Sequence, residues 1–251
     1  MFYDFENLNK MDYAEQIIQC YQQLSSATDQ SSVEQATKFL IDFYNQHKAF
    51  PVLISILHSN NEEIIKQHAA LGLKMTLKNR WKENIDKSEF LKPIFFLLMT
   101  TNSILVANHL IQLIAGLMEE ITSQMVVSFA NQTVNYDPNN NTLDPSFYYP
   151  MAIYSSLKLL DIFMESIEIN ENSMSLYQKI ASDGFQINEP AIQVAAISYT
   201  FHLTCTLCND LGLGPAFPQS LVLMQSLSGN PLIHELFDIF SKTMYHFCPI
   251  I

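Results

Sequence analysis

The stretch Glu62-Glu-Ile-Ile-Lys-Gln-His-Ala-Ala-Leu-Gly-Leu-Lys-Met-Thr-Leu-Lys-Asn-Arg-Trp81 decides how this chain folds. Its small and aliphatic residues recur at spacings of three and four, which places them on one face of a helix. Acidic residues open the stretch and basic residues close it, as the helix dipole favours. Asn60-Asn61 stands directly before it and is predicted to cap the helix. The short apolar segment 49–58 precedes it, so the two segments predict a helical hairpin.

The same pattern recurs along the chain. Long amphipathic segments follow one another at intervals of 31, 41, 44, 42 and 41 residues, and a shorter apolar segment precedes each of them. A repeat of about 40 residues made of two helices is typical of a HEAT solenoid. The sequence therefore predicts an all-α protein, a right-handed α-solenoid of about six HEAT-type hairpins that forms a single domain over residues 1–251. The predicted long segments start near Ser31, Glu62, Ser103, Phe147, Glu189 and Asn230.

Turn residues delimit the hairpins. Pro93 is predicted to lie near the start of a helix, where its missing N–H costs least. Asp183-Gly184 is predicted to end a first helix and Pro190 to open the second. The stretch 135–146 is rich in Asn, Asp and Pro, so it is predicted to be a surface loop insert. The predicted pairs are 11–24 with 31–46, 49–58 with 62–81, 88–100 with 103–121, 122–132 with 147–167, 172–183 with 189–209, and 217–228 with 230–247.

The composition excludes several classes of protein. Hydrophobic residues make up 48% of the chain and glycine is rare, which suits packed helices, and no long stretch alternates as a strand does. The net charge of −12 argues against direct nucleic-acid binding, which needs a basic face. Residues 135–251 carry −8 of that charge, which favours a basic partner surface or serves only solubility.

Two features concern membranes and the chain end. Residues 93–118 contain no charged side chain, but the polar Thr101-Asn102 divides them, so two core helices are predicted rather than membrane insertion. The sequence ends on apolar residues without a polar capping helix. We therefore expect the native protein to continue beyond Ile251; alternatively, Pro249-Ile-Ile251 folds back over the last hairpin.

Chemistry is not predicted. His202, Cys205 and Cys208 share a helical face, but a structural zinc site needs four ligands and no second Cys-x-x-Cys exists, so core packing is the preferred interpretation. No metal and no cofactor are expected. The chain lacks a nucleophile elbow, a phosphate loop and a dinucleotide fingerprint, and its histidines are dispersed. It is expected not to be an enzyme; a deep pocket lined by histidine and acidic side chains would revive that possibility.

Two stretches resemble a known family. The first is Val33-Glu-Gln-Ala-Thr-Lys-Phe-Leu40, followed by Phe50-Pro-Val-Leu-Ile-Ser-Ile-Leu57. The second is Ile65-Lys-Gln-His-Ala-Ala-Leu-Gly-Leu-Lys74, followed by Leu77-Lys-Asn-Arg-Trp81. Over residues 10–81 they resemble the amino-terminal, Ran-binding domain of the importin-β superfamily, the karyopherins. Family members often carry Arg where Lys66 stands, and the 135–146 loop is no part of their pattern.

The resemblance implies a binding site. In karyopherins the second helix of each repeat lines the inner surface, and the first few bind the small GTPase Ran in its GTP form. Three lysines of the 62–81 helix follow a four-residue spacing, which is interpreted as one side of that helix, although a merely solvated face is the commoner reason for such lysines. The candidate Ran contacts are Lys66, Lys74, Lys78, Asn79, Asn108 and Gln112.

The resemblance also implies partners and a location. The chain would be the amino-terminal part of a nuclear transport receptor, importin or exportin, that shuttles between nucleus and cytoplasm with an unknown cargo. Phenylalanine-glycine repeats of nucleoporins would bind between first helices, with Phe185, Phe217 and Leu221 as candidates, although core packing is the preferred interpretation of each. The alternative is another α-solenoid scaffold without Ran binding, such as a trafficking adaptor or a phosphatase regulatory subunit.

Overall fold

A computed structural model describes residues 10–26, 29–80, 88–117, 123–135, 148–169 and 171–210. The chain divides into two compact units, Met1–Gly116 (unit 1) and Leu117–Ile251 (unit 2). Each unit is described by itself. The described residues form ten α-helices and one 3-10 helix, with no strand among them, which confirms the all-helical prediction.

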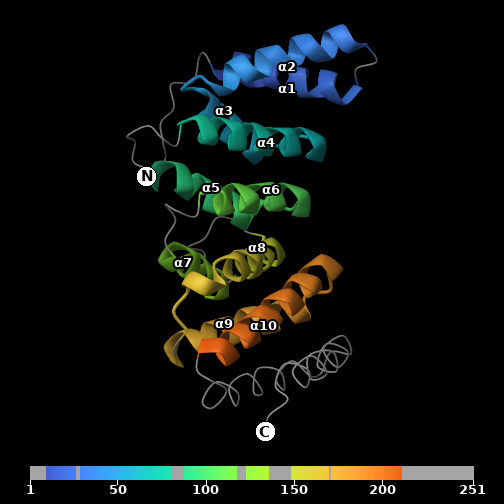
Figure 1. Ribbon diagram of the computed structural model, residues 1–251. Coiled ribbons are helices and arrows are strands. Elements are labelled where there is room, and N and C mark those ends of the chain that lie inside the picture. The colour runs from blue at the N-terminus through green and yellow to red at the C-terminus, as the bar shows by residue number, and fades with distance from the viewer. Residues whose placement is uncertain are drawn as a thin grey trace. The chain divides into compact units, whose positions relative to one another are not determined.

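The described residues of unit 1 form three helical hairpins in two layers (Figure 1). One layer contains the first helix of each hairpin, where α1 packs on α3 and α3 on α5. The other contains the second helices, where α2 packs on α4 and α4 on α6; we call it the second-helix layer of unit 1. The helices are α1 (Lys10–Ser26), α2 (Gln30–Tyr44), α3 (Ala49–His58), α4 (Glu63–Arg80), α5 (Ser88–Thr100) and α6 (Ile104–Ala115).

Unit 2 repeats this arrangement over its described residues. Helix α7 packs on α8 and α9, and α10 packs on both α8 and α9, so α7 with α9 and α8 with α10 form two layers (Figure 1). A short 3-10 helix, η1, follows α8 and packs against α10. The elements are α7 (Ser123–Val134), α8 (Tyr149–Ile162), η1 (Met164–Ser166), α9 (Glu171–Gln186) and α10 (Pro190–Asp210).

The core of unit 1 follows the repeat of the sequence. Ala69 and Leu73 of α4 are fully buried, and so are Leu110 and Ile114, which stand 41 residues later on α6. Positions that are 41 residues apart on these two second helices are thus buried alike. Because neighbouring hairpins bury each other's apolar stripes, no single hairpin needs a core of its own.

The predicted hairpin boundaries agree with the helices over most of the described chain. The α5–α6 turn lies at Thr101–Ser103, as predicted, and Pro190 is the first residue of α10. Helix α6 ends at Ala115, before Gly116, and is shorter than the predicted 103–121, because glycine is a poor helix former. The 217–228 and 230–247 helices, and residues 136–146 of the loop insert, lie outside the described residues.

Two predictions about helix ends are wrong. Pro93 is the sixth residue of α5, beyond the four amino-terminal N–H groups that have no partner in any helix. Gly184 lies inside α9, which continues to Gln186. Its missing side chain serves packing, since a Cβ built there would stand 2.7 Å from Leu157 Cδ1 and 3.1 Å from Ala196 Cβ. Close packing on α8 and α10 therefore outweighs the poor helix propensity of glycine.

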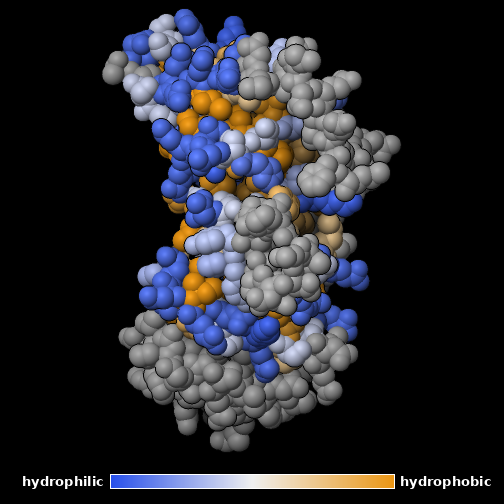
Figure 2. Space-filling model, turned by 180° about the vertical axis from the view of Figure 1, so that it is seen from behind, coloured by the Kyte–Doolittle hydropathy of each residue, from blue (hydrophilic) through white to orange (hydrophobic). Residues whose placement is uncertain are grey.

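The right-handed superhelix, the count of six repeats and the single continuous domain stay predictions. Among the described helices, none is long and apolar enough to cross a membrane, and the uncharged 93–118 stretch divides between α5 and α6. Figure 2 shows hydrophobic side chains in the upper part of the molecule as narrow bands between hydrophilic ones. Such interrupted bands are the edges of a helical core rather than one broad apolar surface.

Candidate protein-binding face of unit 1

The amino-terminal ends of α4 and α6 are tied together. Ser103 caps α6, where its Oγ accepts a hydrogen bond from the Val106 N–H at 3.2 Å. The same hydroxyl donates to the Glu63 carboxylate in the first turn of α4. One side chain thus satisfies an amino-terminal N–H of α6 and fixes where α6 lies against α4. In α2 the cap is Asp29, whose carboxylate accepts from the Ser32 N–H at 2.9 Å.

The lysines of α4 do not lie on one side of the helix. Each four-residue step advances about 40° beyond a full turn, so Lys66 and Lys78 point about 120° apart. Lys74 and Lys78 are exposed, whereas Lys66 is half-buried and Ala70, between them in the series, is fully buried. The interpretation of one lysine row is therefore wrong, and only Lys74 and Lys78 share the exposed side of α4.

That exposed side carries aliphatic side chains that the sequence interpretation missed. Ile64, Leu71 and Met75 are 40%, 43% and 48% exposed. They lie within about 40° of one another around α4, and the buried Leu73 lies opposite. The signal was present in the sequence, because aliphatic residues occur on opposite sides of this helix and only one side can face the core.

The remaining candidates belong to α6 and to the end of α4. On α6, Gln112 is exposed and Asn108 is half-buried, and Leu105 is 51% exposed. Leu105 and Gln112 are seven residues apart and hence on one side of α6. A shift of 41 residues carries Ile64 and Leu71 of α4 onto these two positions. The side chain of Asn79 lies outside the described residues.

An aromatic joint connects the first hairpin to α4. His68 stacks on Tyr21 of α1 with ring centroids 5.3 Å apart, and its Nε2 lies 3.3 Å from Ser25 Oγ. The Tyr21 hydroxyl lies 3.1 Å from the Tyr44 hydroxyl of α2. Gly72 makes room for both tyrosines, since a Cβ there would stand 2.6 Å from the Tyr44 ring. Burial raises the pKa of Tyr21, so both hydroxyls stay protonated and form this joint as neutral groups.

The joint makes unit 1 sensitive to acid. Burial lowers the pKa of His68, because the charged imidazolium is poorly solvated there. The unfolded chain therefore takes up a proton at higher pH than the folded chain does. The stability from His68 is complete above the ordinary histidine pKa and is lost as the pH falls through the lowered pKa. We expect the urea concentration at the unfolding midpoint of unit 1 to decrease as the pH is lowered from about 7 to about 5.

His68→Gln tests this origin of the acid sensitivity. The variant keeps a polar side chain but cannot gain a charge, so its urea midpoint should change less over the same pH range. An unaltered slope in His68→Gln would assign the acid sensitivity to another group.

A second histidine occupies the corresponding place in the next hairpin. His109 stands 41 residues after His68 and is half-buried on α6. Burial lowers its pKa, and the nearby positive charge of Lys74 lowers it further. The charge of Lys74 on α4 is therefore felt at His109 on α6.

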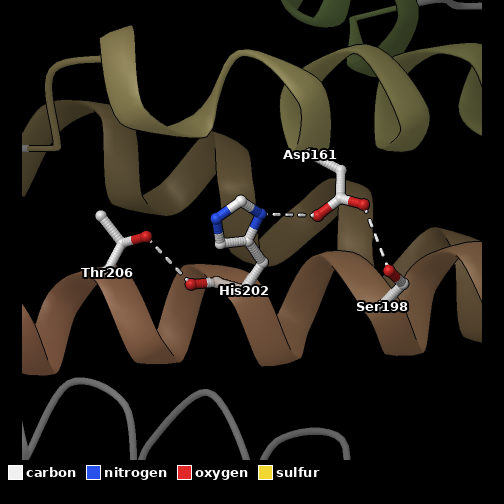
Figure 3. A network of polar contacts seen from close by, with 4 residues as sticks. All are labelled: Asp161, Ser198, His202 and Thr206. Atoms are coloured by element: carbon white, nitrogen blue, oxygen red, sulfur yellow. Dashed lines mark hydrogen bonds and ion pairs between the residues drawn. The ribbon is translucent and has the colours of Figure 1, made fainter.

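The sequence favours core packing for His202, but in unit 2 its side chain belongs to a polar network. His202 Nδ1 lies 3.0 Å from Asp161 Oδ1, and Ser198 Oγ donates to Asp161 Oδ2 at 3.1 Å (Figure 3). The network ties α10 to α8. The side chains of Cys205 and Cys208 lie outside the described residues, and no group of three metal-binding side chains occurs among the described ones.

Among the described residues, none of the candidates for binding nucleoporin repeats has an exposed side chain. Phe185 of α9 is buried, with 9% of its surface exposed, so it is a core residue. Phe217 and Leu221 lie outside the described residues. Grooves between first helices therefore have no exposed candidate from this set.

The two layers of paired helices define a class: a helical-repeat protein. Residues 36–115 match the family of the importin-beta N-terminal domain. The predicted resemblance to the amino-terminal region of the importin-β superfamily is therefore confirmed for these residues. In that family this domain is the region that binds Ran-GTP. No curated protein and no solved structure matches the chain.

Proposed function

We propose that this chain is the amino-terminal part of a nuclear transport receptor and that it binds Ran in its GTP form. The observation that carries the proposal is the match of residues 36–115, which covers most of α2 and all of α3 to α6. Those helices form one packed body in unit 1 with its second-helix layer intact. The function is binding alone, without catalysis, and GTP hydrolysis belongs to the partner.

The second-helix layer of unit 1 is the proposed Ran contact. Lys74 and Lys78 of α4, with Asn108 and Gln112 of α6, belong to that layer, and Lys66 lies at its half-buried side. Exposed lysines favour a partner surface with acidic side chains and accelerate its approach. The same proposal gives the biological setting. The receptor would shuttle between nucleus and cytoplasm, carry a cargo protein and bind nucleoporin repeats.

Nucleotide-selective capture of Ran tests the proposal. The full chain, immobilised, is expected to retain Ran loaded with a non-hydrolysable GTP analogue and not Ran loaded with GDP. Equal capture of both forms, or of neither, would contradict a transport receptor and favour a scaffold of another kind. The result does not depend on which residues make the contact.

Charge reversal of the two exposed lysines tests the surface. Lys74→Glu with Lys78→Glu is expected to weaken binding of Ran-GTP by about 10-fold, mainly by slowing association. Lys92→Glu is the matched control, because Lys92 is exposed on α5, the first helix of the third hairpin. This variant should bind Ran-GTP as the wild type does. Surface plasmon resonance separates the two rates. An unchanged association rate in the double variant would remove both lysines from the site.

A further inference from the structure

A fully buried hydroxyl in unit 2 has no hydrogen-bond partner among the described residues. Tyr199 of α10 is 0% exposed, and its hydroxyl oxygen makes no hydrogen bond to any of them. The great majority of buried polar side-chain atoms in folded proteins are hydrogen-bonded, either to protein or to ordered water. An unbonded buried hydroxyl costs free energy, because its hydrogen bonds to solvent are lost and not replaced. A partner for the Tyr199 hydroxyl is therefore expected in its surroundings.

The carboxylate of Asp161 on α8 lies beside the turn of α10 that contains Tyr199. Ser198 Oγ donates to Asp161 Oδ2 at 3.1 Å, and His202 Nδ1 lies 3.0 Å from Asp161 Oδ1 (Figure 3). Ser198 directly precedes Tyr199, and His202 follows it by less than one helical turn. An ionised carboxylate has about four acceptor sites, so these two contacts leave it able to accept further hydrogen bonds.

Two neighbours act on the Tyr199 hydroxyl from two other helices. Burial raises the pKa of Tyr199, and the nearby Tyr177 of α9 and Asp161 of α8 raise it further. The Tyr177 hydroxyl donates to the Glu168 carbonyl at 3.3 Å, so its oxygen can still accept a hydrogen bond. The Tyr199 hydroxyl thus lies near two possible acceptors, at a junction where α8, α9 and α10 pack on one another.

A water molecule suits this junction better than a direct contact does. Neither acceptor is hydrogen-bonded to the Tyr199 hydroxyl itself. Buried waters typically make about three hydrogen bonds, and they connect polar groups that would otherwise be unsatisfied. The outer edge of the cluster is open to solvent, since the side chains of Asp161 and His202 are 18% and 40% exposed. The cluster therefore extends from the surface to the buried side of α10.

We propose that one buried water molecule links the Tyr199 hydroxyl to the Asp161 carboxylate at the junction of α8, α9 and α10. The water accepts the hydrogen bond of Tyr199 and donates to Asp161, with the Tyr177 oxygen as its second acceptor. Asp161 is then the common acceptor for α10: it binds Ser198 and His202 directly and Tyr199 through the water. This site lies in unit 2 and does not depend on the proposed Ran binding.

Tyr199→Phe in the full chain tests the proposal, because a bonded and an unbonded hydroxyl predict different results. If the hydroxyl is bonded to water, its removal should raise the equilibrium constant of unfolding about 5- to 10-fold. If the hydroxyl is unbonded, its removal should leave that constant unchanged or lower it, because a buried polar group without a partner is lost. Urea denaturation, with hydrogen exchange to assign the change to unit 2, measures the effect.

Tyr148→Phe is the matched control. It removes the same oxygen atom from another tyrosine of unit 2, but Tyr148 is 44% exposed. Its equilibrium constant of unfolding should stay within about twofold of the wild type, as for surface substitutions in general. A Tyr199→Phe variant that behaves like this control, or that is more stable than the wild type, would overturn the proposal.

A double-mutant cycle with Asp161→Ala tests the link between the two side chains. Residues of one hydrogen-bond network are energetically coupled, whereas independent residues have additive effects. Without the carboxylate, Tyr199→Phe should raise the equilibrium constant of unfolding by less than about twofold. An equal effect of Tyr199→Phe with and without Asp161 would assign the hydroxyl to another partner and overturn the proposal.

A high-resolution crystal structure of the full chain gives the direct reading. It should show a water within about 3 Å of both the Tyr199 hydroxyl oxygen and an Asp161 carboxylate oxygen. A direct hydrogen bond between the two side chains, or a junction without this water, would overturn the proposal whatever the variants show.

Discussion

Replacement of Leu73 by alanine is expected to lower the free energy of unfolding of unit 1 by about 2–5 kcal/mol. Leu73 is fully buried on α4, the middle helix of the second-helix layer, which also packs on α1 and α3. Removal of its side chain loses apolar burial and leaves a cavity between helices held on several sides. Urea denaturation of the full chain, with hydrogen exchange to assign the loss to unit 1, measures the effect.

Leu71→Ala is the matched control for this prediction. It removes the same atoms from the same helix two residues earlier, but Leu71 is 43% exposed. Its expected cost is within about 0.5 kcal/mol, as for surface substitutions in general. Equal losses in the two variants would show that the core of unit 1 does not lie where the structure places it.

Gly184→Leu is expected to destabilise unit 2 by about 1–3 kcal/mol or more. The first atom of the new side chain alone would stand 2.7 Å from Leu157 Cδ1 and 3.1 Å from the Ala196 Cβ. Leu157 and Ala196 are both fully buried, and the Ala196 Cβ can move only if α10 moves with it. Overpacking should therefore outweigh the gain of about 1 kcal/mol in helix propensity. Thermal unfolding followed by circular dichroism measures the change.

Gly116→Leu is the matched control for the packing explanation. Gly116 is exposed after α6, and its nearest atoms to a built Cβ are backbone oxygens at 3.4 Å, an ordinary distance. The same substitution should therefore change stability by no more than about 0.5 kcal/mol. Leu157→Ala combined with Gly184→Leu should recover part of the loss, since it removes the nearest obstacle. A double variant no better than the single one would locate the strain elsewhere.

The helical hairpins could be predicted because their apolar spacing repeats. Ala69 and Leu73, with Leu110 and Ile114 one repeat later, lie on regular stripes, and the structure buries all four. Spacing fixes which side of a helix is apolar, and stacking then follows because that side has to be covered. The motif that includes Leu73 also indicated the family that the match of residues 36–115 confirms.

The candidate site was predicted less well, for a geometric reason. A four-residue spacing suggests one side of a helix over two turns, but the deviation accumulates over three steps from Lys66 to Lys78. Burial then separates the lysines further, and it depends on neighbouring helices that spacing does not specify. The exposure of Ile64, Leu71 and Met75 was missed because an aliphatic residue in a helix is assigned to the core whichever way it faces.

Gly184 shows the limit of local rules. Asp-Gly in sequence is typical of a helix end, and nothing local distinguishes it from a glycine that admits a neighbouring helix. The difference lies in Leu157 of α8 and Ala196 of α10, which contact this position from two other helices. Gly72 is a comparable case, where the room is used by Tyr21 and Tyr44 of the first hairpin.

The double hydrogen bonding of Ser103 has a mechanical consequence. Its hydroxyl starts α6 and at the same time holds α6 against the first turn of α4. The two helices are therefore tied at their amino-terminal ends, and sliding along their axes would break the hydrogen bond between Ser103 and Glu63. A pinned pair can still pivot, so flexing between these helices should widen the gap at their carboxyl-terminal ends, on the side of α4 where Lys78 stands.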